Sequence, residues 1–568
     1  MLLSLPVEIL TEITCQSGLD PADHAHLASL HSALYQIVIP HLYKNDIQHG
    51  SSHCVFWAAK TGSLRTLTKA LDYGADPNIV GPDETDTEDI LQIYANVQRL
   101  YHRRNDWVNK EYGTPLHLAA KGGHDNVVTA LLDAGANVHA VSRGLCYCRI
   151  HGTHGVELDF DLDEDEPTFP LPNWLPLHHA VCNGHVSTAN LLLDRGAPLQ
   201  MCYEPRGLPW LLPKLPSLVH CAAANGLETL VQRAIDTDIG TALRGQSDLD
   251  SPLHYACETW NSKGVIERLV SAGHNLNMTG CISREPPLFL ALELNNYAAA
   301  LHLLRAGART RRVRLFARGR RPAMPLLHRA AAPIPTSGIV ELLVPRAERE
   351  LQQSIVIRTL IEDHGLDVDE PWMVNHPSGF YWNGDNKPAL MLRPLHVALC
   401  HIKAKCRGYR IHGPTVKLLL ELGANANKRD FGDDEPLTMA LHHVFCRFGL
   451  WGVIGKEIIP DYMLEPVGLL IDAGARLLRE NENQYDYMGF GTKHGPLGRV
   501  VQSSGPYEYN RQGRLLLEYL LSRATTSNIT KDELEEFCKI ALPNTDEVST
   551  TIILREKRRL FPCRDLSR

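Results

Sequence analysis

Two cysteines and two histidines lie close together in one segment and carry side chains of the kind that bind zinc. They are Cys146, Cys148, His151 and His154, in the pattern Cys-x-Cys-x-x-His-x-x-His. Zinc in proteins prefers such sulfur and nitrogen ligands, and a bound ion could fix an otherwise loose loop. The two cysteines are closer together than in the usual zinc motif, and no second pair of ligands follows. We therefore predict an ordinary loop without a metal or cofactor, with a zinc site as the alternative.

Two other segments carry strong charge of opposite sign. Acidic residues fill much of Glu157–Glu166, but the glycine and the distal glutamate of a calcium-binding loop are missing. Eight arginines lie between Arg305 and Arg321. Both segments are expected to be solvated loops. The alternatives are a docking strip for a basic partner in the acidic segment, and a nuclear-import signal or anion-binding surface in the basic one.

The catalytic motifs that we considered are absent from the sequence or incomplete in it. Gly455 and Lys456 suit a phosphate-binding loop, but Leu450 and Glu457 occupy positions that require glycine and Ser/Thr. The sequence has no Gly-x-Ser-x-Gly elbow and no His-Glu-x-x-His motif. Several of the 28 histidines recur at one position of a repeated phrase, where a structural bond to the backbone is expected: His117, His178, His220, His254, His328 and His396. We predict no catalytic residue and no enzyme activity.

Composition and charge argue against several classes of partner. The net charge is −8 over 568 residues, so nucleic acid is not the expected main partner. No uninterrupted apolar stretch reaches the roughly 18 residues that span a bilayer. Met1–Leu10 lacks the basic start of a signal peptide, and the 14 cysteines show no regular pairing. We expect an intracellular protein, cytoplasmic or nuclear, that binds neither membranes nor nucleic acid.

A repeated phrase predicts the elements that position these residues. It begins with Thr/Ser-Pro-Leu-His-x-Ala, as at Thr114–Ala119, and ends with Leu-Leu-x-x-Gly-Ala, as at Leu131–Ala136. The Thr or Ser can cap a first helix, and the proline fits its first turn. A second helix follows and ends at a glycine suited to left-handed conformation: Gly135, Gly196, Gly273, Gly307, Gly423 or Gly474. Stacked copies would bury the apolar faces that one pair exposes.

Ten copies align on the residue that closes the first part of the phrase. The clear copies end at Ala119, Ala180, Ala256 and Ala398, and the weaker ones at Ala58, Ala222, Ala291, Ala330, Ala440 and Val500. These residues resemble ankyrin repeats, whose period is about 33 residues. The resemblance implies an all-α solenoid over residues 52–525 that binds proteins through its turn tips and first helices. On that basis the candidate contacts, with ordinary surface or packing roles as the alternative, are Tyr112, Lys121, Trp174, Asn183 and Trp260.

Several copies are about 60 residues apart, which predicts inserted loops at about 80–110, 140–173, 364–392 and 479–495. The interval from Ala330 to Ala398 could also hide an extra repeat, because Gly338–Leu343 and Ile357–Gly365 both suit helices. Lys531–Leu542 is expected to form a helix that caps the last repeat. Residues 526–568 are therefore assigned to a C-terminal helical cap and tail.

The first 48 residues do not follow the repeat. Leu5–Ile13 has the pattern Leu-Pro-x-Glu-Ile-Leu-x-x-Ile, and a second helix and a Pro-x-Leu-Tyr exit at Pro40–Tyr43 follow it. This resembles an F-box, although Asp23–Leu27 departs from the usual Asp-Leu pair. The resemblance implies a three-helix head that binds the Skp-type adaptor of a cullin-based ubiquitin ligase. The implied contacts are Leu5, Pro6, Ile9, Leu10, Ile13, Leu30 and Leu34. A helical cap for the array is the alternative.

Together the two resemblances predict a substrate-recognition subunit of a ubiquitin ligase. The head would bind the adaptor, and the array would bind a protein substrate that the sequence does not name. Only His49–Ser52 separates the two parts, so a substrate would be held at a nearly fixed position relative to the adaptor. The alternative is an ankyrin-repeat scaffold with no role in a ligase.

Overall fold

The computed structural model of the chain consists of helices with two short ribbons. The residues that it describes are 6–15, 21–49, 52–81, 112–142, 146, 173–203, 217–237, 250–260, 262–280, 285–311, 324–334, 345–374, 390–399, 413–428, 435–448, 459, 461–478, 495–503, 511–542 and 547–562. They fall into two compact units, Met1–Ala308 and Arg309–Arg568, which are considered separately. The architecture is an all-α solenoid, as the repeated phrase predicted.

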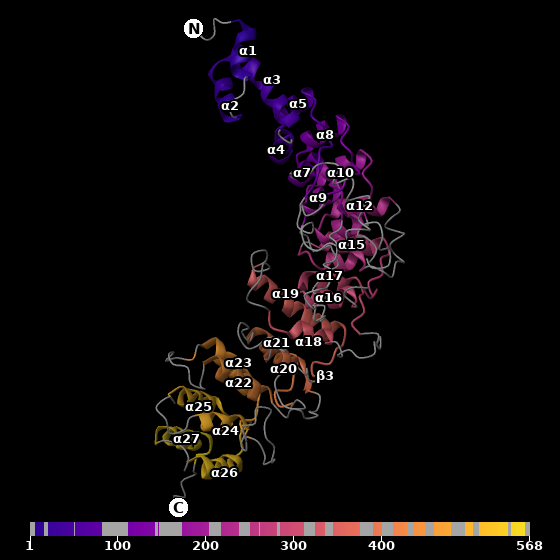
Figure 1. Cartoon of the computed structure of the whole chain (residues 1–568). Helices are drawn as coiled ribbons and strands as arrows, with labels where there is room; N and C mark the ends of the chain where they lie inside the picture. The colour runs from indigo at the N-terminus through magenta and orange to yellow at the C-terminus, as the bar shows by residue number, and fades with distance from the viewer. Residues whose placement is uncertain are drawn as a thin grey trace, which may run out of the picture. The chain divides into compact units, whose positions relative to one another are not determined.

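Three helices form a small head at the N-terminus (Figure 1). They are α1 (Val7–Cys15), α2 (Pro21–Leu30) and α3 (Ser32–His49). The first two pack against α3, and their shared core contains Leu10, Ala28, Leu34 and Val38. The position of these apolar residues on facing sides of the helices explains why the segment folds as a three-helix unit.

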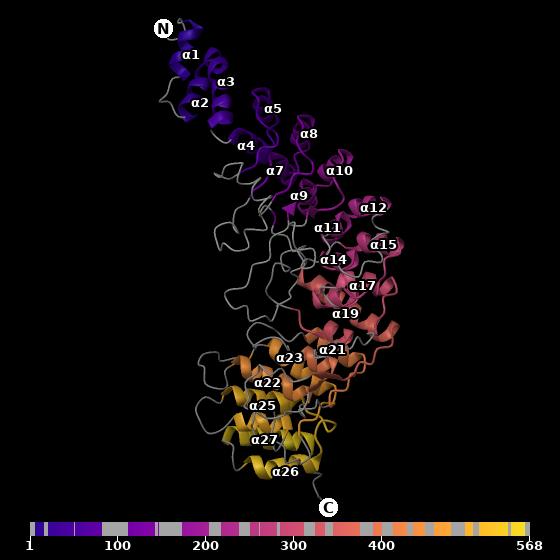
Figure 2. The same ribbon diagram turned by 45° about the vertical axis from the view of Figure 1, so that its right-hand side comes forward.

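The rest of the first unit is a row of antiparallel helix pairs, each lying beside the next (Figure 2). In the described residues the pairs are α4 (His53–Thr61) with α5 (Leu64–Asp72), α7 (Pro115–Gly122) with α8 (Asp125–Asp133), α9 (Pro176–Cys182) with α10 (Val186–Asp194), α11 (Leu218–Ala224) with α12 (Glu228–Asp236), α14 (Pro252–Ala256) with α15 (Lys263–Ser271), and α16 (Pro287–Glu293) with α17 (Tyr297–Arg305). First helices pack on first helices and second helices on second helices. Each pair therefore shares its core with its two neighbours.

The second unit repeats the same arrangement. Its described pairs are α18 (Leu326–Ala331) with α19 (Arg346–Arg358), α20 (Pro394–Leu399) with α21 (Gly413–Glu421), α22 (Pro436–Phe448) with α23 (Asp461–Asp472), and α24 (Gly495–Ser503) with α25 (Arg511–Arg523). A π-helical turn, η5 (Thr359–Asp363), continues α19. Two further helices follow, α26 (Lys531–Ala541) and α27 (Glu547–Leu560), and α27 packs against α25.

The phrase marks the same structural position throughout. All ten closing residues, from Ala58 to Val500, lie in first helices and are fully or almost fully buried. The six glycines predicted to end second helices all have positive φ, between 82° and 96°. At Gly135, for example, φ is 93°, a conformation that residues with a side chain rarely adopt.

The structure contains two antiparallel ribbons among the described residues that helical periodicity did not predict. In the first unit β1 (Asn173–Trp174) pairs with β2 (Cys202–Tyr203), and Trp174 lies opposite Cys202. In the second unit β3 (Trp372–Val374) pairs with β4 (Leu390–Leu392). The strands β3 and β4 join the two ends of the insertion between η5 and α20, whereas β1 and β2 lie on either side of the α9/α10 pair. The ends of the insertion between α8 and α9 meet in an isolated bridge between Ser142 and Trp174. The greater part of the four predicted loops lies outside the described residues.

The interval between Ala330 and Ala398 shows no extra repeat in its described part. Residues 357–365 form the end of α19, the turn η5 and its cap, so they belong to the second helix of the pair that α18 begins. The buried amide of Gln353 on α19 donates to the carbonyl oxygens of Ala330 (2.7 Å) and Ala332 (2.9 Å) and thereby fixes this pairing. The other helix considered for this interval, Gly338–Leu343, lies outside the described residues.

Candidate interaction surfaces

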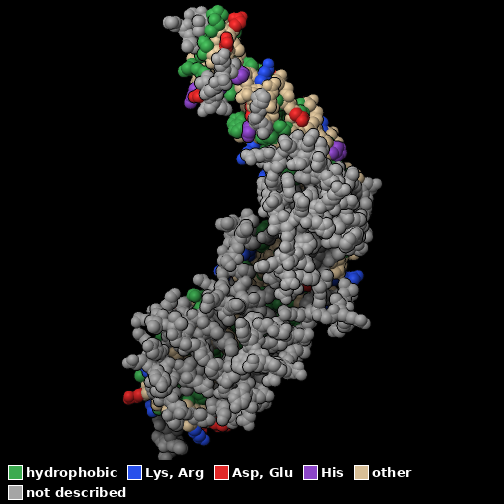
Figure 3. All heavy atoms as spheres, viewed as in Figure 1, with side chains coloured by type: hydrophobic (Ala, Val, Ile, Leu, Met, Phe, Trp, Pro, Cys, Tyr) green, Lys and Arg blue, Asp and Glu red, His purple; other side chains and the backbone are tan. Residues whose placement is uncertain are grey.

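The head exposes a set of large apolar side chains. On α1 the exposed fractions are 61% for Val7, 43% for Ile9 and 48% for Ile13, and Leu30 at the end of α2 is 71% exposed. Hydrophobic side chains gather over this end of the chain in the space-filling view (Figure 3). Ile9 and Ile13 are four residues apart on α1 and therefore lie on one face of the helix. Neighbouring apolar side chains that are exposed are typical of a surface that another protein covers.

The head residues predicted to contact an adaptor differ in how far they are exposed. Pro6, Ile9, Ile13 and Leu30 are exposed, whereas Leu10 and Leu34 are buried, with 3% and 4% of their surface accessible. Leu5 lies outside the described residues. Leu10 and Leu34 therefore hold the three helices together, and only the exposed residues can meet a partner without rearrangement.

The head is joined to the first helix pair by polar contacts. The Asp46 carboxylate on α3 accepts hydrogen bonds from the backbone N–H groups of His53 (3.2 Å) and Cys54 (2.8 Å) at the start of α4. The side chains of Tyr35 and Lys69 are hydrogen-bonded, and Tyr43 packs against Tyr73 with ring centroids 5.6 Å apart. Because Asp46 satisfies amide groups that α4 leaves open, the head acts as the cap of that helix.

The predicted contacts on the array have different surroundings. Lys121 and Asn183 are exposed, near the tips of the turns that follow α7 and α9. Tyr112 and Trp260 are half-buried. Trp174 is 1% exposed and stacks on the ring of His178, with centroids 3.6 Å apart, so it is a packing residue. Its position in a β-ribbon, which the sequence did not predict, explains why it faces inward.

One exposed aromatic residue was missed by the sequence interpretation. Trp57 on α4 is 55% exposed. It occupies the position just before the closing alanine of its copy. His179 and Tyr255 occupy the same position in later copies and are buried. The sequence contained a signal for this residue. The phrase leaves the position variable, and in the first copy of the array it is aromatic. Trp57 is a better candidate for a partner contact than Trp174.

Arginine–acid pairs link successive second helices. Arg195, the residue after α10, reaches Asp133 on α8 (2.7 Å), Arg233 on α12 reaches Asp194 on α10 (2.6 Å), and Arg268 on α15 reaches Glu228 on α12 (2.6 Å). These side chains are partly exposed, so each pair contributes little stability by itself.

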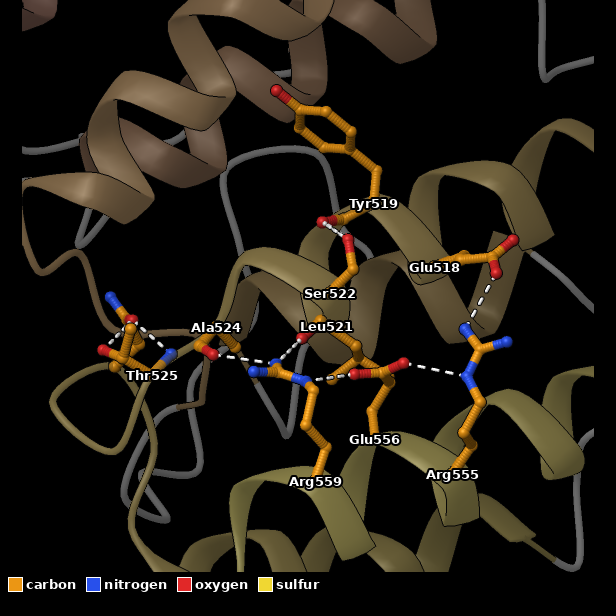
Figure 4. A network of polar contacts seen from close by, with 10 residues as sticks. Glu518, Tyr519, Leu521, Ser522, Ala524, Thr525, Arg555, Glu556 and Arg559 are labelled. Atoms are coloured by element: carbon orange, nitrogen blue, oxygen red, sulfur yellow. Dashed lines mark hydrogen bonds and ion pairs between the residues drawn. The ribbon is translucent and has the colours of Figure 1, made fainter.

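A denser polar network closes the second unit (Figure 4). Arg555 on α27 bridges Glu518 on α25 (2.8 Å) and Glu556 (2.9 Å), while Arg559 donates to the carbonyl oxygens of Leu521 (2.7 Å) and Ala524 (2.9 Å). Burial alone would raise the pKa of Glu556, but hydrogen bonds from Arg559 and Arg555 outweigh it and lower that pKa. The helix α27 thus covers the end of α25 and satisfies its last carbonyl groups.

The phrase histidines are buried in the first helices. The Nδ1 atom of His117 accepts a hydrogen bond from the backbone N–H of Thr114 (3.0 Å), and the Thr114 hydroxyl lies 2.8 Å from the same nitrogen. The cap of α7 therefore works through the histidine ring. Burial lowers the pKa of His117 to about 4 and that of His220 to about 3.

Of the cysteine–histidine cluster considered at residues 146–154, the structure describes Cys146. Cys146 lies beside two residues of α9, with its Sγ atom 3.3 Å from His178 Nε2 and 3.4 Å from Cys182 Sγ. The donor atoms of the three side chains lie within 4.8 Å of one another. Cys148, His151 and His154 are outside the described residues, as is Glu157–Glu166. In the arginine-rich segment Arg305, Arg309 and Arg311 are described and exposed.

Comparison with known families identifies the helix pairs. A model of three ankyrin repeats matches residues 55–201, which include the pairs from α4/α5 to α9/α10, and a single-repeat model matches residues 248–281, which include α14/α15. These segments are ankyrin repeats. Ankyrin repeats are protein–protein interaction modules, so binding of other proteins is the role that this array indicates.

Individual relatives are distant. The Ankyrin repeat and KH domain-containing protein mask-1 of Caenorhabditis elegans is 24% identical over 198 residues, which are 34% of this chain. The matched part spans about 6% of that protein's length. Among solved structures, the human ASB11 ankyrin repeat domain is 20% identical, with a TM-score of 0.31, and the match covers 53% of this chain and 96% of that one. In the described part of this ankyrin protein, no helix is both long and apolar enough to span a membrane.

Proposed function

We propose that this ankyrin-repeat protein is the substrate-recognition subunit of a cullin-type ubiquitin ligase. The head binds a Skp-type adaptor, and the ankyrin array binds the protein substrate. The observation that carries the proposal is the exposure of four large apolar side chains, Val7, Ile9, Ile13 and Leu30, on a three-helix unit whose sequence resembles an F-box.

The junction with the array supports the same role. A receptor has to hold its substrate at a defined position relative to the adaptor. Asp46, Tyr35 and Tyr43 attach α3 directly to the first repeat, so the head is not tethered by a loose linker. The exposed Trp57 on that repeat is the first array residue that we assign to substrate contact.

The test is binding of the purified full chain to a recombinant Skp-type adaptor, measured by calorimetry. We expect the double variant Ile9→Asp/Ile13→Asp to lower the affinity by at least ~100-fold, because buried interface residues of this kind dominate binding energy. Both side chains are exposed, so the fold should tolerate the change. Leu351→Asp, at a 60% exposed leucine in the second unit, is the matched control and should bind like the unmodified chain.

Point variants are sharper than deletion of the head. Removing residues 1–48 would also remove Asp46 and leave the first amides of α4 without their acceptor. A loss of binding would then mix two effects. Absence of adaptor binding by the unmodified chain, or full binding by the double variant, would contradict the proposal.

A scaffold without a ligase role is the second candidate. The same junction favours it, because a head that caps α4 already has a structural purpose. The Skp-type adaptor assay separates the two candidates. If the head is only a cap, the unmodified chain does not bind the adaptor, and the head variants still fold with the array intact.

A further inference from the structure

Three side chains from two separate segments meet in the first unit. Cys146 comes 13 residues after Asp133, the last residue of α8, while His178 and Cys182 are four residues apart on α9 and therefore on the same helical face. The distances are 3.4 Å between the two Sγ atoms and 3.3 Å from Cys146 Sγ to His178 Nε2. All three donor atoms lie within 4.8 Å of one another.

His178 departs from the contacts that its position makes elsewhere. In His117, His220 and His254 the Nδ1 atom accepts a hydrogen bond from the backbone N–H of the cap residue, at 3.0, 3.3 and 3.0 Å. The Nε2 atom of His254 then faces a backbone carbonyl, that of Glu285, at 2.8 Å. His178 directs Nε2 to a cysteine sulfur instead.

The residue before α9 explains the departure. Leu175 stands where the other copies have Thr114, Ser217 or Ser251, so no hydroxyl is present, and its backbone N–H donates to the carbonyl of Met201 (3.1 Å). Trp174 stacks on the imidazole at an interplanar angle of 11° and fixes the plane of the ring. The stacking holds the ring with Nε2 directed at Cys146.

We propose that Cys146, His178 and Cys182 bind a structural zinc ion. Sulfur and nitrogen are the ligands that zinc prefers, and tetrahedral bonds of about 2.3 Å to sulfur and about 2.0 Å to nitrogen would separate the donor atoms by roughly 3.5–3.8 Å. The two observed distances are close to that range. On binding, each thiol releases its proton to solvent and the imidazole donates its Nε2 lone pair.

The surroundings suit this role. The His178 side chain is fully buried, so protein atoms surround the imidazole. Its second nitrogen, Nδ1, lies 3.9 Å from the sulfur of the buried Cys221. The ion would attach the long insertion after α8 to α9. A water or another ligand completes the tetrahedron, and the proposal does not depend on Cys148, His151 or His154.

The experiment is metal analysis of the full chain, purified without chelators and then dialysed against micromolar zinc. We expect about one zinc per chain, and at least a tenfold lower content in Cys146→Ser and in Cys182→Ser. Cys54→Ser is the matched control, since Cys54 is also a half-buried free cysteine but lies outside the cluster. It should retain the zinc. Far-UV circular dichroism checks that each variant is folded.

A second measurement covers the case in which a serine variant fails to fold. Cobalt(II) loaded into the unmodified chain should give the thiolate-to-cobalt absorption band of a site with two sulfur ligands. A folded, unmodified chain that binds no zinc and shows no such band would overturn the proposal. So would full zinc content in folded Cys182→Ser, or a disulfide between Cys146 and Cys182 in non-reduced peptides. The outcome is independent of adaptor binding, so it is separate from the proposed ligase role.

Discussion

The helices α14 and α9 begin with the same three residues, Pro-Leu-His, but their histidines make different contacts. His254 on α14 accepts from the Ser251 N–H through Nδ1 and faces the Glu285 carbonyl through Nε2, so both of its nitrogens serve the backbone. His178 on α9 faces Cys146 and stacks on Trp174. The phrase therefore predicts the helix pair, whereas the contacts of its histidine differ between these two copies, which have different cap residues.

Lowering the pH is expected to have the largest effect on stability, because it acts on buried histidines of the first helices. Burial lowers the pKa of His117 to about 4 and of His220 to about 3, so both stay neutral in the folded chain while the unfolded chain protonates them near 6.5. Their contribution is complete above pH 7 and is lost as the pH falls toward those folded values. From pH 7 to 5 we expect about 2 kcal/mol of lost stability per histidine, about 4 in all.

Urea unfolding of the full chain at pH 7 and pH 5, followed by circular dichroism, measures this loss. The variant His117→Gln should be less stable at pH 7 and should show a smaller change between the two pH values. An unfolding curve of the unmodified chain that does not move with pH would mean that these histidines are not held neutral by burial.

Replacing the histidine itself tests the comparison directly. We expect His254→Ala to cost about 3 kcal/mol, because it creates a cavity and leaves the buried N–H of Ser251 and carbonyl of Glu285 without their partner. In zinc-free protein, His178→Ala should cost roughly 1–2 kcal/mol, because it removes the stacking on Trp174 and the contact with the Cys146 sulfur. The measurement is the midpoint of urea unfolding for both variants in the presence of a chelator. A larger loss for His178→Ala would reverse our view of which histidine supports the backbone.

The repeat could be predicted from sequence because its signals are local. Pro115 starts a helix and Gly135 ends one through backbone geometry alone, so their roles do not depend on distant residues. The burial of Trp174 could not be predicted, because it follows from a ribbon that joins Asn173–Trp174 to Cys202–Tyr203. The head shows both cases. Its helices follow from local spacing, but the burial of Leu10 and Leu34 depends on how those helices pack.

The surroundings of Cys146 could not be predicted for the same reason. The sequence interpretation looked for four ligands within nine consecutive positions and so joined Cys146 to Cys148, His151 and His154. The described partners of Cys146 are instead about 32 and 36 residues away in sequence and are brought to it by the stacking of α9 on α7. His178 had been assigned entirely to the repeat, because the phrase explained it.

The attachment of the α9/α10 pair to the α7/α8 pair can be tested at a glycine. His185, just before α10, places Nε2 3.0 Å from the Lys121 carbonyl, and its ring passes over Gly123. A Cβ atom at Gly123 would lie 2.4 Å from His185 Nδ1, and φ there is +69°. We expect Gly123→Ala to cost about 2 kcal/mol, since the ring must move and the backbone is strained.

Gly135→Ala is the matched control for this prediction. Its φ is +93°, but a Cβ atom there meets nothing within 4 Å, so only the backbone strain of about 1 kcal/mol remains. Thermal unfolding of both variants measures the difference. Equal losses would show that the contact between His185 and Gly123 adds nothing, and that α9 is held to α7 mainly by its apolar face.

The arginine pairs on the second helices should show the smallest effect and should not distinguish the two regions. Arg233 pairs with Asp194 on the α9/α10 pair, and Arg268 pairs with Glu228 next to the α14/α15 pair. Because these side chains are partly exposed and screened by solvent, we expect Arg233→Ala and Arg268→Ala each to cost about 0.5 kcal/mol. The loss should shrink further in 0.5 M salt, about five times the concentration at which screening acts over about 10 Å. A much larger loss at Arg233 alone would mean that the region around α9 depends on its outer ion pairs. In that case the difference between His178 and His254 would be one part of a wider reorganisation instead of the consequence of a single cap residue.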